Sequence, residues 1–330
     1  MPTQLIWAPD TALPGFEAAT LPFPDDEEGP VVATLVRRRA AAPAGRAVLY
    51  LHGFIDYFFQ AHLTEAYTAQ GYHFYALDLR KYGRSIRPHQ TPNYCRDLHE
   101  YYPEIEAAIE QITGPEGHSW LLLNGHSTGG LTGALYAHDG ARRAQISALF
   151  LNSPFFDLNV TRPTRVFGQL VTRIGGPLPK IPLGGALSPF YGQSVHKDHK
   201  GEWEFNTAWK PIAGFPAYAG WLRAITAGQR QLQAGLQIAC PILLMHSARS
   251  IVPKAWSDDL MRADIVLNVE HMRRFGPGLG RDITLVAIEG GMHDLTLSAA
   301  PVRAHVFSEL FAWLGRVTGW HAFAALTLTG

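Results

Sequence analysis

The segment 124–130 restricts the possible fold more than any other part of the chain. It follows the apolar run 120–123 directly and has the form Gly-x-Ser-x-Gly, with Ser127 at its centre. This pattern is typical of a sharp turn between a strand and a helix, on which the serine hydroxyl stands above a sheet. A Cβ at Gly125 or Gly129 would collide with the incoming strand or the outgoing helix. The segment therefore predicts a strand, a strained turn and a helix, with Ser127 as a candidate nucleophile.

Short apolar runs recur along the chain, with helical patterns between them. The runs are 31–36, 47–51, 72–78, 120–123, 146–151, 241–246 and 283–288, and the clearest helical patterns are 100–112 and 302–314. Apolar runs without alternation suit strands that are buried on both faces. We therefore predict an α/β fold, with a mostly parallel central sheet and helices on both faces. A turn rich in proline and acidic residues is expected at 22–30, before the first of these strands.

The stretch between Asn152 and Pro241 has a different character from the rest. It is rich in proline, glycine and aromatic residues and is far longer than an ordinary connection between a strand and the next helix. It predicts an inserted lid or cap over 154–238, which divides the core into 1–153 and 239–330. A chain of 330 residues is long enough for such a core and insertion.

Composition excludes several classes of function. Lys+Arg and Asp+Glu both number 28, and no basic stripe is present, which argues against nucleic acid or an anionic membrane surface as partner. The two cysteines, Cys95 and Cys240, are too few for a disulfide framework or a four-sulfur zinc site. The chain has no apolar stretch of about 18 residues and no signal-like N-terminus. We expect a cytoplasmic protein without integral membrane association, and no cofactor or metal, since no dinucleotide or Walker motif is present.

Four motifs in order resemble the α/β-hydrolase family over roughly residues 30 to 315. They are His52-Gly53-Phe54, the Asp-x-Arg-x-x-Gly-x-Ser loop at 78–85, the Gly-x-Ser-x-Gly turn, and the loop 290–295 that contains His293. Within that family the chain is most similar to the lysophospholipase and monoacylglycerol-lipase group, also described as serine-aminopeptidase-like hydrolases. The resemblance implies an α/β-hydrolase fold.

The resemblance also implies a mechanism. Ser127 would be the nucleophile, His293 its base, and the backbone N–H groups of Phe54 and Thr128 would bind the oxyanion. Chemistry supports this assignment, because a serine hydroxyl is a weak nucleophile at neutral pH and needs a base within hydrogen-bond reach. The expected reaction is hydrolysis of a carboxylic ester through an acyl-enzyme.

The third member of the triad departs from the family pattern His-Gly-x-x-Asp-x-Val. Residues 246–252 read His-Ser-Ala-Arg-Ser-Ile-Val, so Ser250 stands where the aspartate belongs. Asp264 lies before His293 at the spacing that is usual in this family, and we predict that it is the acid, placed after an insertion over 251–263. Asp157 is the alternative, because some family members take their acid from the earlier strand. Asp258 and Asp259 are expected to be surface carboxylates.

The substrate is predicted from the aromatic residues near these motifs. Tyr57 and Phe58 follow the oxyanion motif, and Phe155 and Phe156 begin the insertion. We expect these four to contact a small-molecule ester with an apolar acyl group, such as an acylglycerol, a lysophospholipid or an aryl or alkyl ester, although core packing explains Tyr57 and Phe58 equally well. An aminopeptidase or amidase of the same fold is the enzymatic alternative. The Ser250 replacement leaves open a hydrolase-like binding protein without catalysis.

Overall fold

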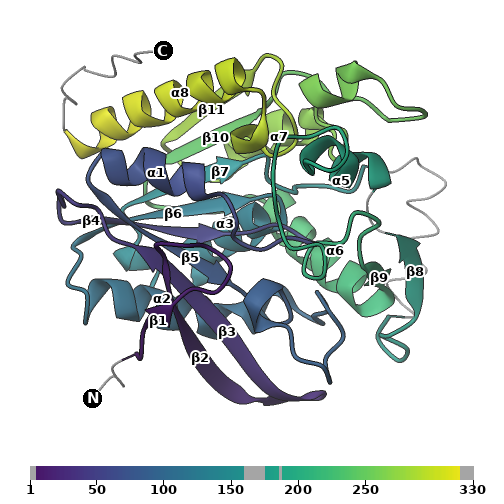
Figure 1. Ribbon diagram of the computed structural model, residues 1–330, viewed down its shortest axis with the longest axis horizontal. Helices are drawn as coiled ribbons and strands as arrows, with labels where there is room; N and C mark the ends of the chain where they lie inside the picture. Colours follow the sequence, from purple (N-terminus) through teal and green to yellow (C-terminus); the bar gives the residue numbers. More distant parts are fainter. Residues whose placement is uncertain (1–4, 160–174, 186–187, 320–330) are drawn as a thin grey trace.

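A nine-stranded sheet forms the centre of the computed structural model, which describes residues 5–159, 175–185 and 188–319 (Figure 1). Its strands lie in the order β1-β2-β3-β5-β4-β6-β7-β10-β11. Their bounds are β1 Ala8–Pro9, β2 Glu17–Asp26, β3 Gly29–Arg38, β4 Arg46–Leu51, β5 Tyr72–Asp78, β6 Trp120–His126, β7 Ala148–Asn152, β10 Ile242–Ser247 and β11 Ile283–Ile288.

The sheet is antiparallel at one end and parallel through the rest. Strands β1, β2, β3 and β5 pair antiparallel, whereas β5, β4, β6, β7, β10 and β11 are parallel to their neighbours. The register pairs Leu51 with Gly125 and His126 with Asn152. The carboxyl ends of the parallel strands therefore share one edge of the sheet, where ligands bind in open α/β sheets.

Helices cover both faces of the sheet, as predicted. α1 (Ala61–Ala69) and α8 (Ala300–Thr318) pack on one face, and α2 (Tyr102–Thr113) and α3 (Thr128–Asp139) pack on the other (Figure 1). In α2, the buried residues Ile105, Ala108, Ile109 and Ile112 recur at helical spacing. Pro103 in the first turn suits the start of this helix, because the N–H that proline lacks has no intrahelical acceptor there.

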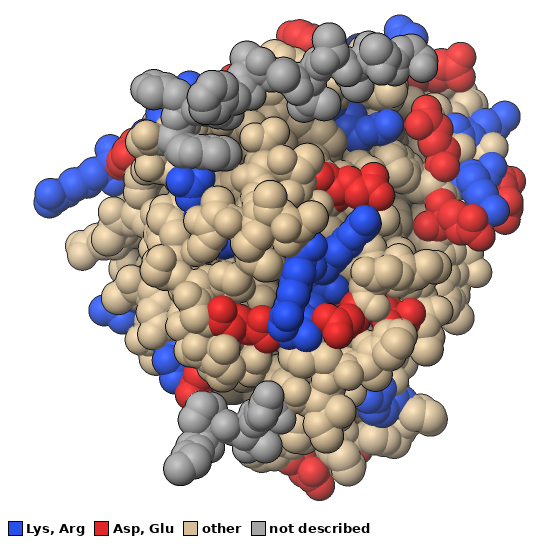
Figure 2. Space-filling view, turned by 60° about the vertical axis from the view of Figure 1, so that its left-hand side comes forward, with Lys and Arg blue, Asp and Glu red and all other residues tan. Residues whose placement is uncertain are grey.

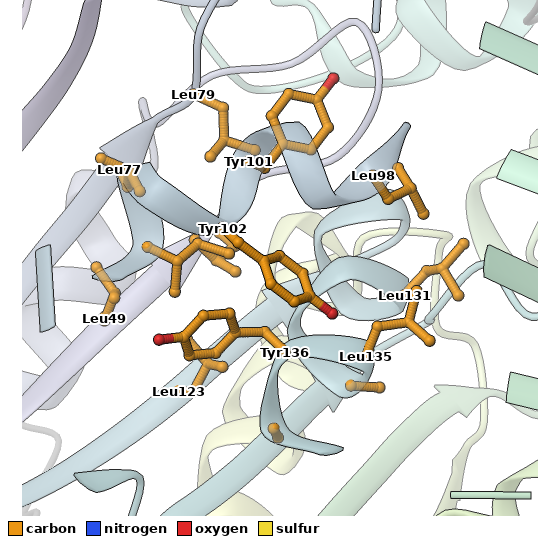
Figure 3. Close-up of a cluster of buried hydrophobic side chains, with 14 of the residues drawn as sticks. Leu49, Leu77, Leu79, Leu98, Tyr101, Tyr102, Leu123, Leu131, Leu135 and Tyr136 are labelled. Carbon is orange, nitrogen blue, oxygen red and sulfur yellow. The ribbon is translucent and has the colours of Figure 1, made fainter. Parts of the chain in front are cut away.

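Aromatic packing fixes the position of α3 (Figure 3). Leu49, Leu77 and Leu123 of the sheet lie in one buried cluster with side chains of α2 and α3. The rings of Tyr102 and Tyr136 meet edge to face at 4.9 Å, and the Tyr102 hydroxyl donates to the Asp139 carboxylate at 2.7 Å. The helix that begins directly after Ser127 is therefore tied to its neighbour at its far end.

The predicted turn at 22–30 is wrong for most of its length, because residues up to Asp26 belong to strand β2. Pro22 and Pro24 lie in this strand although proline cannot donate to a ladder. Pro22 pairs with Val32 of β3, while the described part of β1 pairs only with Glu17 and Ala18. The proline-containing half of β2 is thus an edge, where strands tolerate proline.

The long connection between β7 and β10 contains the segment predicted to be a lid, and it is called the insertion below. Its described elements are β8 (Pro182–Gly185), α5 (Pro189–Val195), β9 (Pro216–Tyr218) and α6 (Ala219–Gln233), and β8 pairs with β9. Residues 160–174 and 186–187 of the predicted lid 154–238 lie outside the described residues. Ala224, Ile225 and Leu232 of α6 join the core cluster of α2 and α3. This part of the insertion therefore contributes buried side chains to the core.

Charge is distributed in mixed groups on the face shown in Figure 2. A central group of Lys and Arg side chains lies between Asp and Glu side chains, and much of the remaining surface is uncharged. This face therefore lacks the uniformly basic stripe that a nucleic-acid-binding surface carries. Within the described ranges, no helix combines the length and the hydropathy that crossing a bilayer requires.

Candidate active site

Ser127 sits on a strained turn between β6 and α3. Its backbone has φ +53° and ψ −116°, a conformation that residues with side chains rarely adopt. A Cβ at Gly125 would lie 2.5 Å from the carbonyl oxygen of Gly129, and a Cβ at Gly129 would overlap the carbonyl oxygens of Leu51 and His52. Both positions therefore require glycine, as expected for the sharp turn.

Ser127, His293 and Asp264 form one hydrogen-bonded chain. The Oγ of Ser127 is 3.0 Å from Nε2 of His293, and Nδ1 of His293 is 2.9 Å from Oδ2 of Asp264. The other oxygen of Asp264 accepts from the backbone N–H groups of Val266 and Leu267, at 2.9 and 2.7 Å. Ser127 is 8 % exposed and Asp264 is fully buried. A hydroxyl, an imidazole and an oriented carboxylate in this order can move a proton from serine to histidine.

Asp264 reaches this position by a detour of the chain. The chain leaves the sheet after Ser247, and residues 251–263 form a loop whose two flanking residues, Ser250 and Asp264, make a parallel bridge. The Ile251 N–H donates to the Asp264 carbonyl at 2.9 Å, and the Asp264 N–H donates to the Arg249 carbonyl at 3.0 Å. The Ser250 hydroxyl accepts from the N–H of Val269, at the start of α7 (Val269–Phe275). Ser250, which occupies the position expected for the acid, thus binds the backbone of α7, and Asp264 lies next to it in the bridge.

The other candidate carboxylates have different neighbours. Asp157 accepts from the N–H of Leu158 and lies 3.8 Å from Nε2 of His271 on α7. Asp259 is exposed and pairs with Arg249 at 3.0 Å. The structure therefore brings Asp264 to His293, and it places Asp157 against α7.

The loop after β4 is held by the ring of His52. Its Nε2 accepts from the N–H of Leu79 at 3.1 Å, so its Nδ1 carries a proton and donates to the Gly53 carbonyl at 2.8 Å. Burial lowers the pKa of His52, which keeps the ring neutral. Thr128 is the first residue of α3, where an N–H has no intrahelical acceptor. Of the two predicted oxyanion residues, Thr128 follows Ser127 directly, and Phe54 follows Gly53, where a Cβ would lie 3.1 Å from the Ser127 Cβ.

Asp294 is a buried group that the sequence did not identify. Its Oδ1 accepts from the Asn152 amide at 2.8 Å, the Thr296 N–H at 3.0 Å and the Thr296 hydroxyl at 2.7 Å. Burial raises the pKa of this carboxyl, but the nearby His126 and these hydrogen bonds outweigh burial and lower it below its ordinary value. The ionised side chain ties the loop that carries His293 to the end of β7.

The four predicted substrate contacts lie in three different hydrophobic clusters. The Phe155 N–H donates to the carbonyl of Ser127 at 3.0 Å, and Phe156 is buried in the cluster of α2 and α3. The Tyr57 hydroxyl accepts from the N–H of Asn206 in the insertion. Phe58 is fully buried and packs against Phe16, Tyr50 and Phe74 on the opposite face of the sheet from α2 and α3. For Phe58 the structure therefore shows the packing role that the sequence allowed.

Tyr191 of α5 lies beside His293, and no sequence motif identified it as a candidate site residue. Its ring centroid is 5.5 Å from that of His293, and the ring is almost fully buried. The ring of His126 approaches His293, with 4.9 Å between the ring centroids.

Within the described ranges, no group of three His, Cys, Asp or Glu side chains is arranged to hold a metal ion.

Comparisons with known proteins identify the family and the fold of the chain. The sequence model of a family described as serine aminopeptidase, S33, matches residues 42–298. No curated protein sequence matches the chain. A monoacylglycerol lipase from Paleococcus ferrophilus superposes with a TM-score of 0.64 at 20% identity, over 86% of this chain and 99% of the other.

Two further solved structures share the fold at low sequence identity. A soluble variant of monoglyceride lipase from Saccharomyces cerevisiae, in complex with a substrate analog, has a TM-score of 0.64 at 17% identity, over 90% of this chain and 96% of the other. An esterase from Exiguobacterium antarcticum has a TM-score of 0.56 at 15% identity, over 88% and 98%. At such identities the likeness shows the fold, and the α/β-hydrolase prediction is confirmed.

Proposed function

Because the chain belongs to the serine aminopeptidase S33 family of α/β hydrolases, we propose that it hydrolyses carboxylic esters through an acyl-enzyme on Ser127. The observation that carries this proposal is the chain of hydrogen bonds from Ser127 through His293 to Asp264. Ser127 Oγ attacks the ester carbonyl while His293 Nε2 takes its proton. His293 then gives this proton to the leaving alcohol, and a water molecule hydrolyses the acyl-enzyme by the same route in reverse.

The remaining groups stabilise charge. Asp264 holds the Nδ1–H tautomer of His293 and stabilises the imidazolium. The N–H groups of Phe54 and Thr128 donate to the oxyanion of the tetrahedral intermediate. Loss of one such donor costs ~3 kcal/mol of transition-state stabilisation in other serine hydrolases, so both contacts matter for rate.

An ester is favoured over the N-terminus of a peptide by the electrostatics of the site. An aminopeptidase needs a carboxylate that can pair with the substrate ammonium group. Each buried aspartate described near the nucleophile already has partners: Asp264 has His293, Asp294 has Asn152 and Thr296, and Asp56 has Lys210. The names of the solved relatives, two lipases and an esterase, point in the same direction. We propose an apolar acyl group, with the insertion covering it as a lid.

The test is hydrolysis of p-nitrophenyl esters from acetyl to palmitoyl, with Ser127→Ala as the control. We expect turnover that the substitution abolishes, together with labelling of Ser127 by a fluorophosphonate. The optimum in chain length then identifies the acyl class. A folded wild-type protein that neither turns over any ester nor becomes labelled would contradict the proposal.

An aminopeptidase or amidase is the second candidate, because the matching family carries that description. Aminoacyl p-nitroanilides provide the comparison under the same conditions. Labelling of Ser127 combined with turnover of the anilides alone would move the assignment to this second activity.

A further inference from the structure

The insertion contacts three consecutive residues of the loop that follows Phe54. Gly214 approaches Ile55 so closely that a Cβ there would lie 3.0 Å from the Ile55 Cδ1. The Lys210 ammonium pairs with Asp56 at 2.6 Å. The Asn206 N–H donates to the Tyr57 hydroxyl at 2.7 Å. One stretch of the insertion, 206–214, therefore lies against the turn that carries the proposed oxyanion donor.

The ion pair in this contact is buried on both sides. The Lys210 side chain is 5 % exposed and that of Asp56 is 3 % exposed. The ammonium lies 5.3, 5.5 and 5.7 Å from the ring centroids of Phe59, Phe205 and Tyr191, distances at which a cation is attracted to an aromatic face. A buried ion pair adds little to net stability, because desolvation offsets its attraction, but it fixes geometry. We therefore expect the main effect of the Lys210–Asp56 pair to be that it fixes the position of Asp56.

Strain in the same turn explains why that position matters. Ile55 has φ +53°, which is unfavourable for a β-branched residue. Such a conformation persists only when the surrounding contacts over-determine it. Ile55 lies between Phe54 and Asp56, so the orientation of the Phe54 N–H depends on contacts that keep this turn in place.

We propose that Lys210 is a positioning residue for catalysis: through Asp56 it holds the strained turn at Ile55, so that the Phe54 N–H points at the developing oxyanion. The inference rests on the proposed function of Ser127. It makes the 206–214 stretch a fixed support for the catalytic loop, whatever the rest of the insertion does.

The first test is Lys210→Met, which keeps the length of the side chain and removes its charge. A donor that binds only the transition state affects kcat rather than KM. We expect kcat to fall by about 10- to 100-fold, less than the 10²- to 10³-fold effect of losing a whole donor. KM should change by less than about 2-fold. The matched control is Lys197→Met, because Lys197 forms an exposed pair with Glu204 on the same insertion, and wild-type kinetics are expected for it.

A second variant separates positioning from folding. Lys210→Met leaves the Asp56 carboxylate buried without its partner, which destabilises the fold, and Asp56→Asn/Lys210→Met removes that charge as well. We expect the double variant to recover the thermal stability that the single variant loses, while kcat stays low. A double variant with wild-type kcat would overturn the inference, as would a loss in Lys210→Met that appears only in KM.

The rate at which a fluorophosphonate phosphonylates Ser127 is a measurement that does not depend on the ester substrate. In this reaction the Ser127 Oγ gives its proton to His293 Nε2 and forms a bond to phosphorus, fluoride leaves, and the phosphoryl oxygen occupies the oxyanion site. We expect Lys210→Met to slow labelling by about 10-fold or more. Equal rates in wild type and variant would overturn the inference alone. A wild-type protein that is not labelled would overturn the proposed function and this inference together.

Discussion

Both carboxylate oxygens of Asp264 are occupied, and this fixes the imidazole beside them. Oδ1 accepts from two backbone N–H groups and Oδ2 faces Nδ1 of His293. The carboxylate therefore cannot rotate without breaking three hydrogen bonds. A protonated Nδ1 leaves Nε2 unprotonated and directed at Ser127, which is the tautomer that a general base requires.

Asp264→Asn is expected to lower kcat by about 10⁴-fold, because the amide can donate to Nδ1 and favour the wrong tautomer, as it does in a related triad. Steady-state ester hydrolysis measures this loss. Asp157→Asn is the matched control and should keep most of the activity. A large loss in Asp157→Asn, with Asp264→Asn nearly active, would reassign the acid.

Single residues were predictable where the signal is local. Ser127 and His293 lie in short motifs, and Asp264 was found from its spacing to His293. Asp294, Tyr191 and Lys210 have partners far away in the sequence, such as Asn152, which no nearby pattern indicates. The role of Phe58 was not predictable, because the sequence next to a motif does not distinguish an aromatic residue that contacts a substrate from one that packs in the core.

Among the elements, the β2–β3 hairpin carries a charged contact to the insertion. Glu28 lies at its tip and pairs with Lys81 at 2.7 Å and with Lys180, which precedes β8, also at 2.7 Å. Burial raises the pKa of Glu28, but hydrogen bonds from Lys180, Lys81 and Thr91 outweigh it and lower the pKa to about 2. The hairpin and the insertion are thus linked through one ionised carboxylate.

Glu28→Gln is expected to destabilise the protein at pH 6 and to matter progressively less in acid. The ordinary pKa of this carboxyl is 4.5, so between pH 4.5 and 2 the unfolded chain binds a proton that the folded protein does not. The stabilisation is therefore complete above pH 4.5 and is lost as the pH falls. Urea unfolding between pH 6 and 3 measures it. Glu65→Gln serves as the control, because Glu65 is exposed. A difference in the free energy of unfolding between wild type and Glu28→Gln that does not change with pH would contradict the linkage.

Most elements of the parallel sheet were predictable because strands buried on both faces are continuous apolar runs. β11 differs, because it is a partly exposed edge strand that nevertheless has a mostly apolar sequence. The predictions for β4, β5, β6, β10 and β11 agree with the structure to within a few residues. β2 was missed because its prolines and acidic residues resemble a turn. Its strand conformation comes from pairing with β3, a non-local contact that the segment itself does not encode.

For the molecule as a whole, a stack of three side chains is one of the contacts that join core and insertion. Trp203 lies on the ring of His62 of α1 at 4.1 Å, and the Arg303 guanidinium of α8 lies 4.7 Å from the Trp203 ring. The Trp203 indole also donates to the Leu297 carbonyl at 2.9 Å. Burial lowers the pKa of His62 to about 4, and its Nε2 is 2.8 Å from the Thr296 carbonyl.

Global stability is therefore expected to fall as the pH drops from about 6.5 to 4. In this window an unfolded His62 takes up a proton that the folded ring excludes, so the free energy of unfolding decreases with falling pH. Burial lowers the pKa of His118 to about 4 as well, which adds to the effect. Urea titrations at pH 7.5, 6 and 4.5 measure the slope. His62→Phe should reduce the slope and leave the contribution of His118, and an unchanged slope would contradict the assignment.

The bridge between Ser250 and Asp264 has a consequence for how this protein can change over evolution. This bridge holds the two ends of the loop 251–263 together, so residues can be added to or deleted from the loop while the Asp264 carboxylate keeps its place. The entropy of closing a longer loop rises only slowly with its length, which makes such changes tolerable. The loop 251–263 also contacts the insertion, because the ring centroids of Trp256 and of Phe190 in α5 are 6.4 Å apart. A lineage could therefore change the surface that this loop presents to the insertion and inherit unaltered the hydrogen bonds that join Ser127, His293 and Asp264.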